Sequence, residues 1–168
     1  MSSESPSSSP PPDPDIAHLV ALLGTWRGRG RGDYPTIDDF EYLEEVTIGH
    51  VGKPFLSYAQ KTRDAHTDLP LHAESGYFRP VGVGEVELVV AQPSGIVELH
   101  TGAVTAGQEL RLELATLHVH TTPTAKSVTE VTRSITIAAD TMHYEVAMAA
   151  VGQPLQHHLT ATLQRITD

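Results

Sequence analysis

Residues 142–148 read Met-His-Tyr-Glu-Val-Ala-Met, so that larger apolar or aromatic side chains at every second position alternate with His, Glu and Ala. A period of two puts one set of side chains on one face of a β-strand and the other set on the opposite face. The same alternation occurs at residues 85–90 and 110–114, and residues 127–137 are rich in β-branched side chains, which favour strands. The pattern predicts strands with one buried face.

Turn-forming residues divide the chain after residue 24 into about ten segments of ordinary strand length. No second helical pattern interrupts the segments, so parallel crossovers are excluded. We predict an all-β fold, a closed antiparallel β-barrel of about ten strands that is lipocalin-like or fatty-acid-binding-like, and wide enough to enclose a cavity. The turns are expected at residues 33–35, 49–54, 64–70, 79–84, 92–95, 105–108, 121–126, 138–141 and 151–154.

One short helix is predicted before the strands. Asp13 is a suitable N-cap, Pro14 suits the first helical position, and Gly24 supplies a stop. A single apolar stripe at helical spacing indicates that the helix lies against the barrel; it consists of Ile16, Leu19, Val20 and Leu23. The preceding residues 1–13 are Ser/Pro-rich and are expected to be disordered, which leaves residues 14–168 as the barrel domain.

Charge and composition exclude several classes of function. The chain has 21 acidic and 11 basic residues and no cysteine. A net charge of −10 repels nucleic acid and anionic membranes, and the missing thiols exclude disulfides and thiolate catalysis. No apolar run reaches about 18 residues and no signal-peptide pattern is present, so we expect a cytoplasmic protein. Separately, we expect either a monomer or a weak homodimer. Ten histidines point to metal or cofactor chemistry.

The glycines of residues 24–32, Gly-Thr-Trp-Arg-Gly-Arg-Gly-Arg-Gly, do not match the spacing of a phosphate-binding loop. In a strand, Gly28 and Gly30 share one face, which allows close approach by the helix or by a ligand. Arg27, Arg29 and Arg31 then share the other face, which we expect to be solvated.

Histidines offer two candidate metal-binding arrangements. His118 and His120 lie two residues apart and project to the same side of a strand, where His100 would be a third ligand of a mononuclear metal enzyme. The second arrangement is the pair His157-His158 near the C-terminus. Periodicity alone turns His157 inward with the apolar row, but a bulge after Pro154 would exchange the two faces, so sequence physics leaves the choice open.

Paired carboxylates and hydrolase motifs give no catalytic site. Asp38-Asp39 and Glu44-Glu45 are adjacent in sequence, so the members of each pair should lie on opposite faces of a strand. The chain has no nucleophile elbow, and its serines cluster near the N-terminus.

From the helix to the C-terminus the chain resembles the nitrobindin family. The motifs that carry the resemblance are Gly24-Thr-Trp26-Arg-Gly28-Arg-Gly30 with Tyr34-Pro35-Thr36-Ile37, Ala125-Lys126 with Thr132-Arg133, and the closing Gln153-Pro-Leu-Gln-His157-His158-Leu159.

The resemblance implies one haem b per chain, held near the open end of a ten-stranded barrel. The family's axial histidine directly precedes the Leu of the closing strand, which corresponds to His158 here, with His157 as the fallback. The resemblance also implies that Lys126 meets a haem propionate. Other implied neighbours of the haem are Thr36, Gly24, Trp26, Gly28 and Gly30.

The implied function is scavenging of peroxynitrite. The resemblance implies a ferric haem that binds nitric oxide and isomerises peroxynitrite to nitrate: the O–O bond breaks to give nitrogen dioxide, which then recombines with the remaining oxygen atom. Two alternatives remain on sequence grounds. One is a non-catalytic nitric oxide sensor or carrier, and the other is a lipocalin-like carrier of an apolar metabolite.

Overall fold

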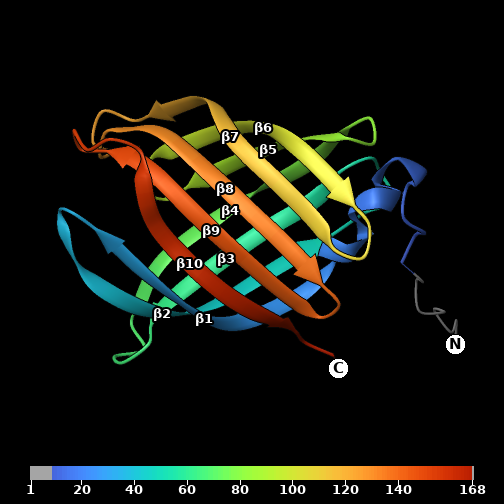
Figure 1. Ribbon diagram of the computed structural model, residues 1–168, viewed down its shortest axis with the longest axis horizontal. Coiled ribbons are helices and arrows are strands. Elements are labelled where there is room, and N and C mark those ends of the chain that lie inside the picture. The colour runs from blue at the N-terminus through green and yellow to red at the C-terminus, as the bar shows by residue number, and fades with distance from the viewer. Residues whose placement is uncertain (1–8, 168) are drawn as a thin grey trace, which may run out of the picture.

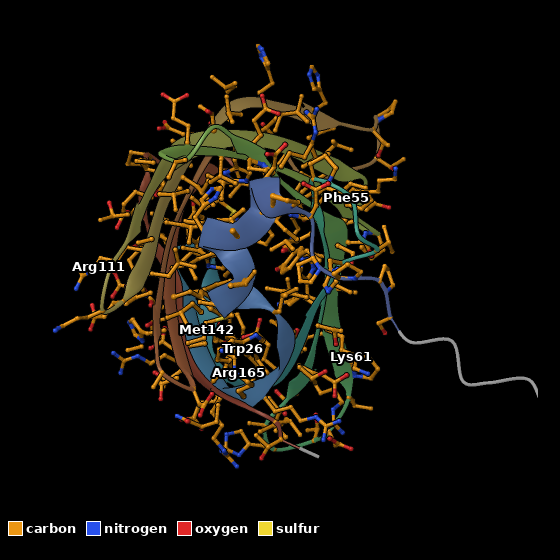
Figure 2. All side chains as sticks on the ribbon, turned by 90° about the vertical axis from the view of Figure 1, so that its right-hand side faces the viewer. Trp26, Phe55, Lys61, Arg111, Met142 and Arg165 are labelled. Carbon is orange, nitrogen blue, oxygen red and sulfur yellow. The ribbon has the colours of Figure 1, made fainter. Side chains whose placement is uncertain are left out.

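A short N-terminal helix closes one end of the molecule. The structure is a computed structural model that describes residues 9–167, so most of the segment predicted to be disordered lies outside the described residues. Helix η1 (Pro14–Leu22) starts at Asp13, whose carboxylate accepts a hydrogen bond from the Asp15 N–H, as the sequence predicted. Figure 2 shows η1 lying across the end of the barrel.

The helix differs from the prediction in its apolar stripe. It is a 3₁₀-helix, and three residues per turn put Ile16, Leu19 and Leu22 on one face, all fully buried. The expected stripe was wrong at Val20, which is 42% exposed. The tighter winding of the helix moves the buried position from Val20 to Leu22.

Ten antiparallel strands form the closed barrel shown in Figure 1, which confirms the predicted fold. Strands adjacent in the chain pair with each other, and β1 pairs with β10 to close the sheet. Each predicted turn covers a connection between two consecutive strands, although some ranges extend into a strand end, as residues 79–81 do in β4. The strands are β1 (Gly24–Tyr34), β2 (Ile37–Gly49), β3 (Leu56–Asp64), β4 (Pro70–Val81), β5 (Glu85–Gln92), β6 (Ile96–Ala106), β7 (Leu110–Thr121), β8 (Val128–Ala138), β9 (Thr141–Ala150) and β10 (Gln156–Arg165).

The glycines of β1 allow the barrel to close. A side-chain carbon at Gly28 would collide with the carbonyl oxygen of Thr162 on β10, and one at Gly30 would collide with the ring of Tyr42. Close approach was therefore predicted correctly, but the groups that approach are the neighbouring strand and Tyr42 rather than the helix or a ligand. Arg27, like the other two arginines of β1, is exposed as expected, and it pairs with Glu45 at 2.7 Å.

The barrel has two distinct ends because its strands alternate in direction. Helix η1 and the larger apolar cluster, which includes Trp26, Leu56 and Leu112, lie at one end. The loops that follow β1, β3, β5, β7 and β9 gather at the other end, which we call the open end. A smaller apolar cluster around Tyr34 and Val131 lies there.

The 3₁₀ geometry of η1 predicts which of its apolar residues holds the helix in place. Leu22→Ala should lower the free energy of unfolding by about 3 kcal/mol, because a fully buried Leu leaves a cavity when it is truncated. Val20→Ala is the matched control and should change the free energy by about 0.5 kcal/mol at most. Urea denaturation measures both, and equal losses in the two variants would contradict the observed face of the helix.

Candidate functional site

The barrel encloses a cavity of about 620 Å³ that runs from the open end to helix η1. His158 and Lys126 line it at the open end, and Leu22 of η1 lines it at the other. The walls between them are mixed. Apolar residues include Phe40, Val46, Ile48, Phe78, Ile135, Met142 and Leu159, and polar residues include Tyr42, Glu44, Tyr58, Gln60, Glu74, Glu98, Arg133 and Tyr144.

His158 faces the cavity because β10 contains a bulge. The register between β10 and β9 shifts between His157 and Leu159, so that His158 and Leu159 both reach the cavity wall. An extra residue in a strand exchanges the two faces beyond it. The periodicity that favoured His157 as the inward residue fails for this reason.

The imidazole of His158 is held in one orientation. Its Nδ1 lies 3.1 Å from the carbonyl oxygen of Asp33, to which it must donate a hydrogen bond. The ring packs edge-on against Tyr34 at 5.3 Å between ring centroids. Burial lowers the pKa of His158, so the ring is neutral near pH 7. With the proton on Nδ1, the Nε2 atom carries a lone pair, and the residues 9–167 offer it no hydrogen-bond partner.

His157 points away from the cavity. Its side chain is exposed, and its Nε2 lies 3.6 Å from the carboxylate of Asp33 on the outer surface. It lines a separate outer hollow together with Arg31 and His66. Asp33 therefore contacts both histidines, one through its backbone inside the barrel and the other through its side chain outside.

The structure separates the other predicted site residues into two groups. Lys126, in the loop between β7 and β8, lines the cavity at the open end. Trp26 is fully buried against η1, where its Nε1 donates to the Leu22 carbonyl and the Arg165 guanidinium lies 4.1 Å from its ring centre. Among the described residues, those that line the cavity do not include Trp26, Thr36, Gly24, Gly28 or Gly30.

The three histidines of the alternative metal site, His100, His118 and His120, do not come together. His118 and His120 stack at 5.9 Å on the exposed face of β7, whereas His100 is buried and bonds to Glu98 at 2.7 Å. Within the part of the chain that the structure describes, no group of three or more His, Cys, Asp or Glu side chains could hold a metal ion.

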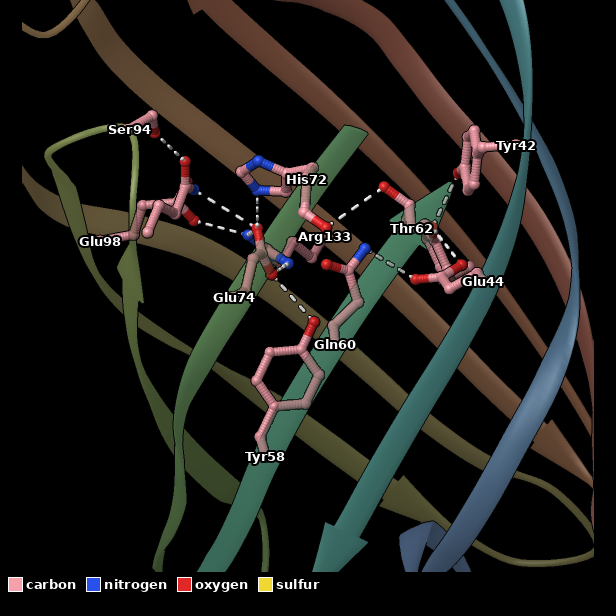
Figure 3. A network of polar contacts seen from close by, with 12 residues as sticks. Tyr42, Glu44, Tyr58, Gln60, Thr62, His72, Glu74, Ser94, Glu98 and Arg133 are labelled. Carbon is pink, nitrogen blue, oxygen red and sulfur yellow. Dashed lines mark hydrogen bonds and ion pairs between the residues drawn. The ribbon is translucent and has the colours of Figure 1, made fainter. Parts of the chain in front are cut away.

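A buried ionic group crosses the middle of the cavity, as Figure 3 shows. Arg133 of β8 donates to Glu74 of β4 and to Glu98 of β6, both at 2.8 Å. Burial alone would raise the pKa of each carboxyl, but the Arg133 guanidinium, together with the hydrogen bonds of His72 to Glu74 and of His100 to Glu98, lowers the pKa of both. Both carboxylates are therefore ionised, and the group carries two negative charges against one positive charge.

A second polar group in the cavity centres on Glu44 of β2. The Tyr144 hydroxyl donates to Glu44 at 2.7 Å, and the Gln60 amide donates to its other oxygen at 2.9 Å. The Tyr42 and Tyr144 hydroxyls lie 2.8 Å apart. Burial raises the pKa of Glu44 to about 7, so this carboxyl exchanges a proton in the neutral range.

Sequence reasoning missed both polar groups. It correctly placed Glu44 and Glu45 on opposite faces, since Glu45 lies outside, where Arg27 and Lys61 pair with it. It did not consider inward carboxylates on separate strands. The available signal was the presence of polar residues such as Glu44 and Gln60 at positions that the alternation assigns to the inner face.

These features define a barrel protein suited to carry a metal-containing ligand. They are the closed ten-stranded barrel, the wide cavity and the inward imidazole of His158 with its free Nε2. Residues 15–165 match the family model described as "THAP4-like, heme-binding beta-barrel domain". The chain therefore belongs to this family of haem-binding β-barrels.

Named relatives and a solved structure agree with this assignment. The chain is 54% identical to peroxynitrite isomerase 2 of Mycobacterium marinum over 90% of this chain and 95% of the relative. It is 52% identical to the peroxynitrite isomerase of Nocardia farcinica over 90% of this chain and 91% of the relative. The crystal structure of Rv2717c from M. tuberculosis superimposes with a TM-score of 0.91 at 50% identity, covering 94% of this chain and 100% of that one.

No helix among the described residues is long and apolar enough to span a membrane.

The raised pKa of Glu44 predicts a dependence of stability on pH. Between its ordinary value of 4.5 and about 7, the folded protein keeps a proton that the unfolded chain has released, so Glu44 makes the free energy of unfolding fall as the pH rises. The free energy of unfolding of Glu44→Gln, measured relative to that of the native protein, should therefore increase by about 2 kcal/mol between about pH 5 and about pH 8.

Glu45→Gln is the matched control on the outer face. Hydrogen bonds from Lys61 and Arg27 lower the pKa of Glu45, so this carboxyl affects the pH dependence of stability only below about pH 5, and the variant should differ from the native protein by a nearly constant amount between the two pH values. Urea denaturation at the two pH values measures both variants. A Glu44→Gln effect that does not change with pH would show that Glu44 is ionised throughout.

Proposed function

We propose that the chain binds one haem b at the open end of the barrel and isomerises peroxynitrite to nitrate. The observation that carries the proposal is the inward, oriented His158 in a chain of the haem-binding family. The names of the relatives from M. marinum and N. farcinica support the choice of substrate.

The residues at the open end fit a haem. The hydrogen bond from Nδ1 of His158 to the Asp33 carbonyl fixes the tautomer and turns the Nε2 lone pair toward the cavity. A carbonyl partner on the other ring nitrogen also raises the basicity of a ligating imidazole. His158 is thus the residue that would ligate the haem iron.

Lys126 is proposed to bind the carboxylates of the haem at the rim. It lies at the mouth of the cavity, where an ammonium group is close to water and to any carboxylate at the rim. The apolar residues Val131, Met148 and Leu159 would pack against the faces of the ring and exclude water.

Bound haem supplies an iron centre at which peroxynitrite is rearranged to nitrate. The protein's own charges determine where an anion can stay. Glu74 and Glu98 carry one negative charge more than Arg133 neutralises, which repels an anion from the middle of the cavity. Lys126 attracts it to the mouth. The substrate is therefore held at the open end, where the haem would lie.

Nitric oxide is proposed as a second ligand of the same site. The proposed location is the cytoplasm, since a chain without cysteine suits a reducing compartment. The proposed oligomeric state is a monomer or a weak homodimer.

The ionic group around Arg133 argues against a carrier of apolar metabolites, because such a ligand would desolvate charged side chains across the middle of the cavity.

His158→Ala should abolish saturable haem binding, because the side chain that ligates the iron is removed, whereas the matched variant His157→Ala should retain it. Stepwise addition of haem, followed by visible absorption, measures binding at one haem per chain. Stopped-flow decay of peroxynitrite measures activity, which should be fast only in the proteins that hold haem. Loss of binding in His157→Ala with retention in His158→Ala would overturn the assignment.

A further inference from the structure

A row of aromatic side chains leads from His158 into the cavity. The ring of Phe40 lies 6.4 Å from that of His158, and the ring of Tyr42 lies 5.9 Å from that of Phe40. The Tyr42 hydroxyl contacts that of Tyr144 at 2.8 Å. Phe40, Tyr42 and Tyr144 all line the cavity, so a small molecule inside it reaches their rings directly.

The row ends at a base. Tyr144 donates its hydroxyl proton to Glu44 at 2.7 Å, and Tyr42 is left to donate to the Tyr144 oxygen. A phenol that loses an electron becomes a strong acid and must give up its proton in the same step. Glu44 is placed to receive that proton, and its pKa of about 7, raised by burial, makes it a competent acceptor. The hydrogen bond from Tyr42 would then stabilise the oxygen of the resulting phenoxyl radical.

The other three of the five tyrosines have different surroundings. Tyr34 touches His158, but its hydroxyl donates to the carbonyl oxygen of Met148, which is a weak base. Tyr58 donates to Glu74, whose pKa Arg133 holds well below its usual range despite burial. Tyr77 is half exposed and packs against Phe55 outside the barrel. Tyr58 also lines the cavity and donates to a carboxylate, so the Tyr42–Tyr144 pair differs in two ways: a second phenol donates to the first, and the acceptor Glu44 forms no ion pair with the described residues.

We propose that the Tyr42–Tyr144 pair reduces nitrogen dioxide radical that enters or escapes into the cavity, with Glu44 as the proton acceptor. The electron from Tyr144 converts nitrogen dioxide to nitrite, and the phenolic proton moves to Glu44. The products are nitrite, a neutral phenoxyl radical on Tyr144 and a protonated Glu44 carboxyl. The inference rests on the proposed function only for the source of nitrogen dioxide, which is the fragment expected from O–O cleavage of peroxynitrite.

The test supplies nitrogen dioxide directly. Pulse radiolysis of a nitrite solution generates the radical in the presence of the haem-loaded protein and, in parallel, of the chain without added haem. Rapid freezing and electron paramagnetic resonance then detect a tyrosyl radical. The native protein should give this signal, Tyr42→Phe/Tyr144→Phe should lose it, and the outer-surface control Tyr77→Phe should keep it.

Glu44→Gln tests the proton transfer while both phenols stay in place. It should form the radical about a hundredfold more slowly, because the base that takes the proton is gone. An unchanged rate in Glu44→Gln, or an unchanged signal in the double variant, would overturn the inference. A normal radical signal in a protein that does not isomerise peroxynitrite would instead refute the proposed function and leave the inference standing.

Discussion

The hydrogen-bonded pairing of β1 with β10 is the contact on which the rest of the structure depends. It joins the two ends of the sheet, removes both sheet edges and encloses the cavity. It requires glycine at position 28, because a side chain there would meet the backbone of β10. The same pairing brings Asp33 at the end of β1 beside His158 at the start of β10, so closure of the barrel and orientation of the candidate ligand arise from one contact.

Closure also sets the chemistry of the interior. Strands β2, β4 and β6 each contribute one buried carboxylate, and these are Glu44, Glu74 and Glu98. Arg133 neutralises part of the charge of two of them and keeps both ionised, whereas Glu44 has tyrosine and glutamine partners and a pKa near neutrality. The cavity is therefore divided between a mouth with an imidazole and an ammonium group and a middle that disfavours anions. This division favours reaction at the mouth and proton transfer deeper inside.

The sequence predicted the barrel, its turns and the position of the helix, because alternating side chains and turn residues are local signals. It did not predict the buried ionic group, since the contacts of Arg133 depend on the register of strands that are distant in the chain. Periodicity also could not choose between His157 and His158, because a one-residue bulge leaves the composition of a strand unchanged while it exchanges the faces. The choice of His158 came from the family resemblance, and its inward position has a physical cause in the bulge.

We propose that closure of the barrel orients Nε2 of His158 as the ligand of a haem iron. A crystal structure of the haem-loaded protein is the test. We expect iron bound by Nε2 of His158, with the hydrogen bond from Nδ1 to the Asp33 carbonyl retained and the haem edge near Lys126. Iron bound by His157 or by His72 on the cavity wall, or haem bound outside the cavity, would refute this proposal.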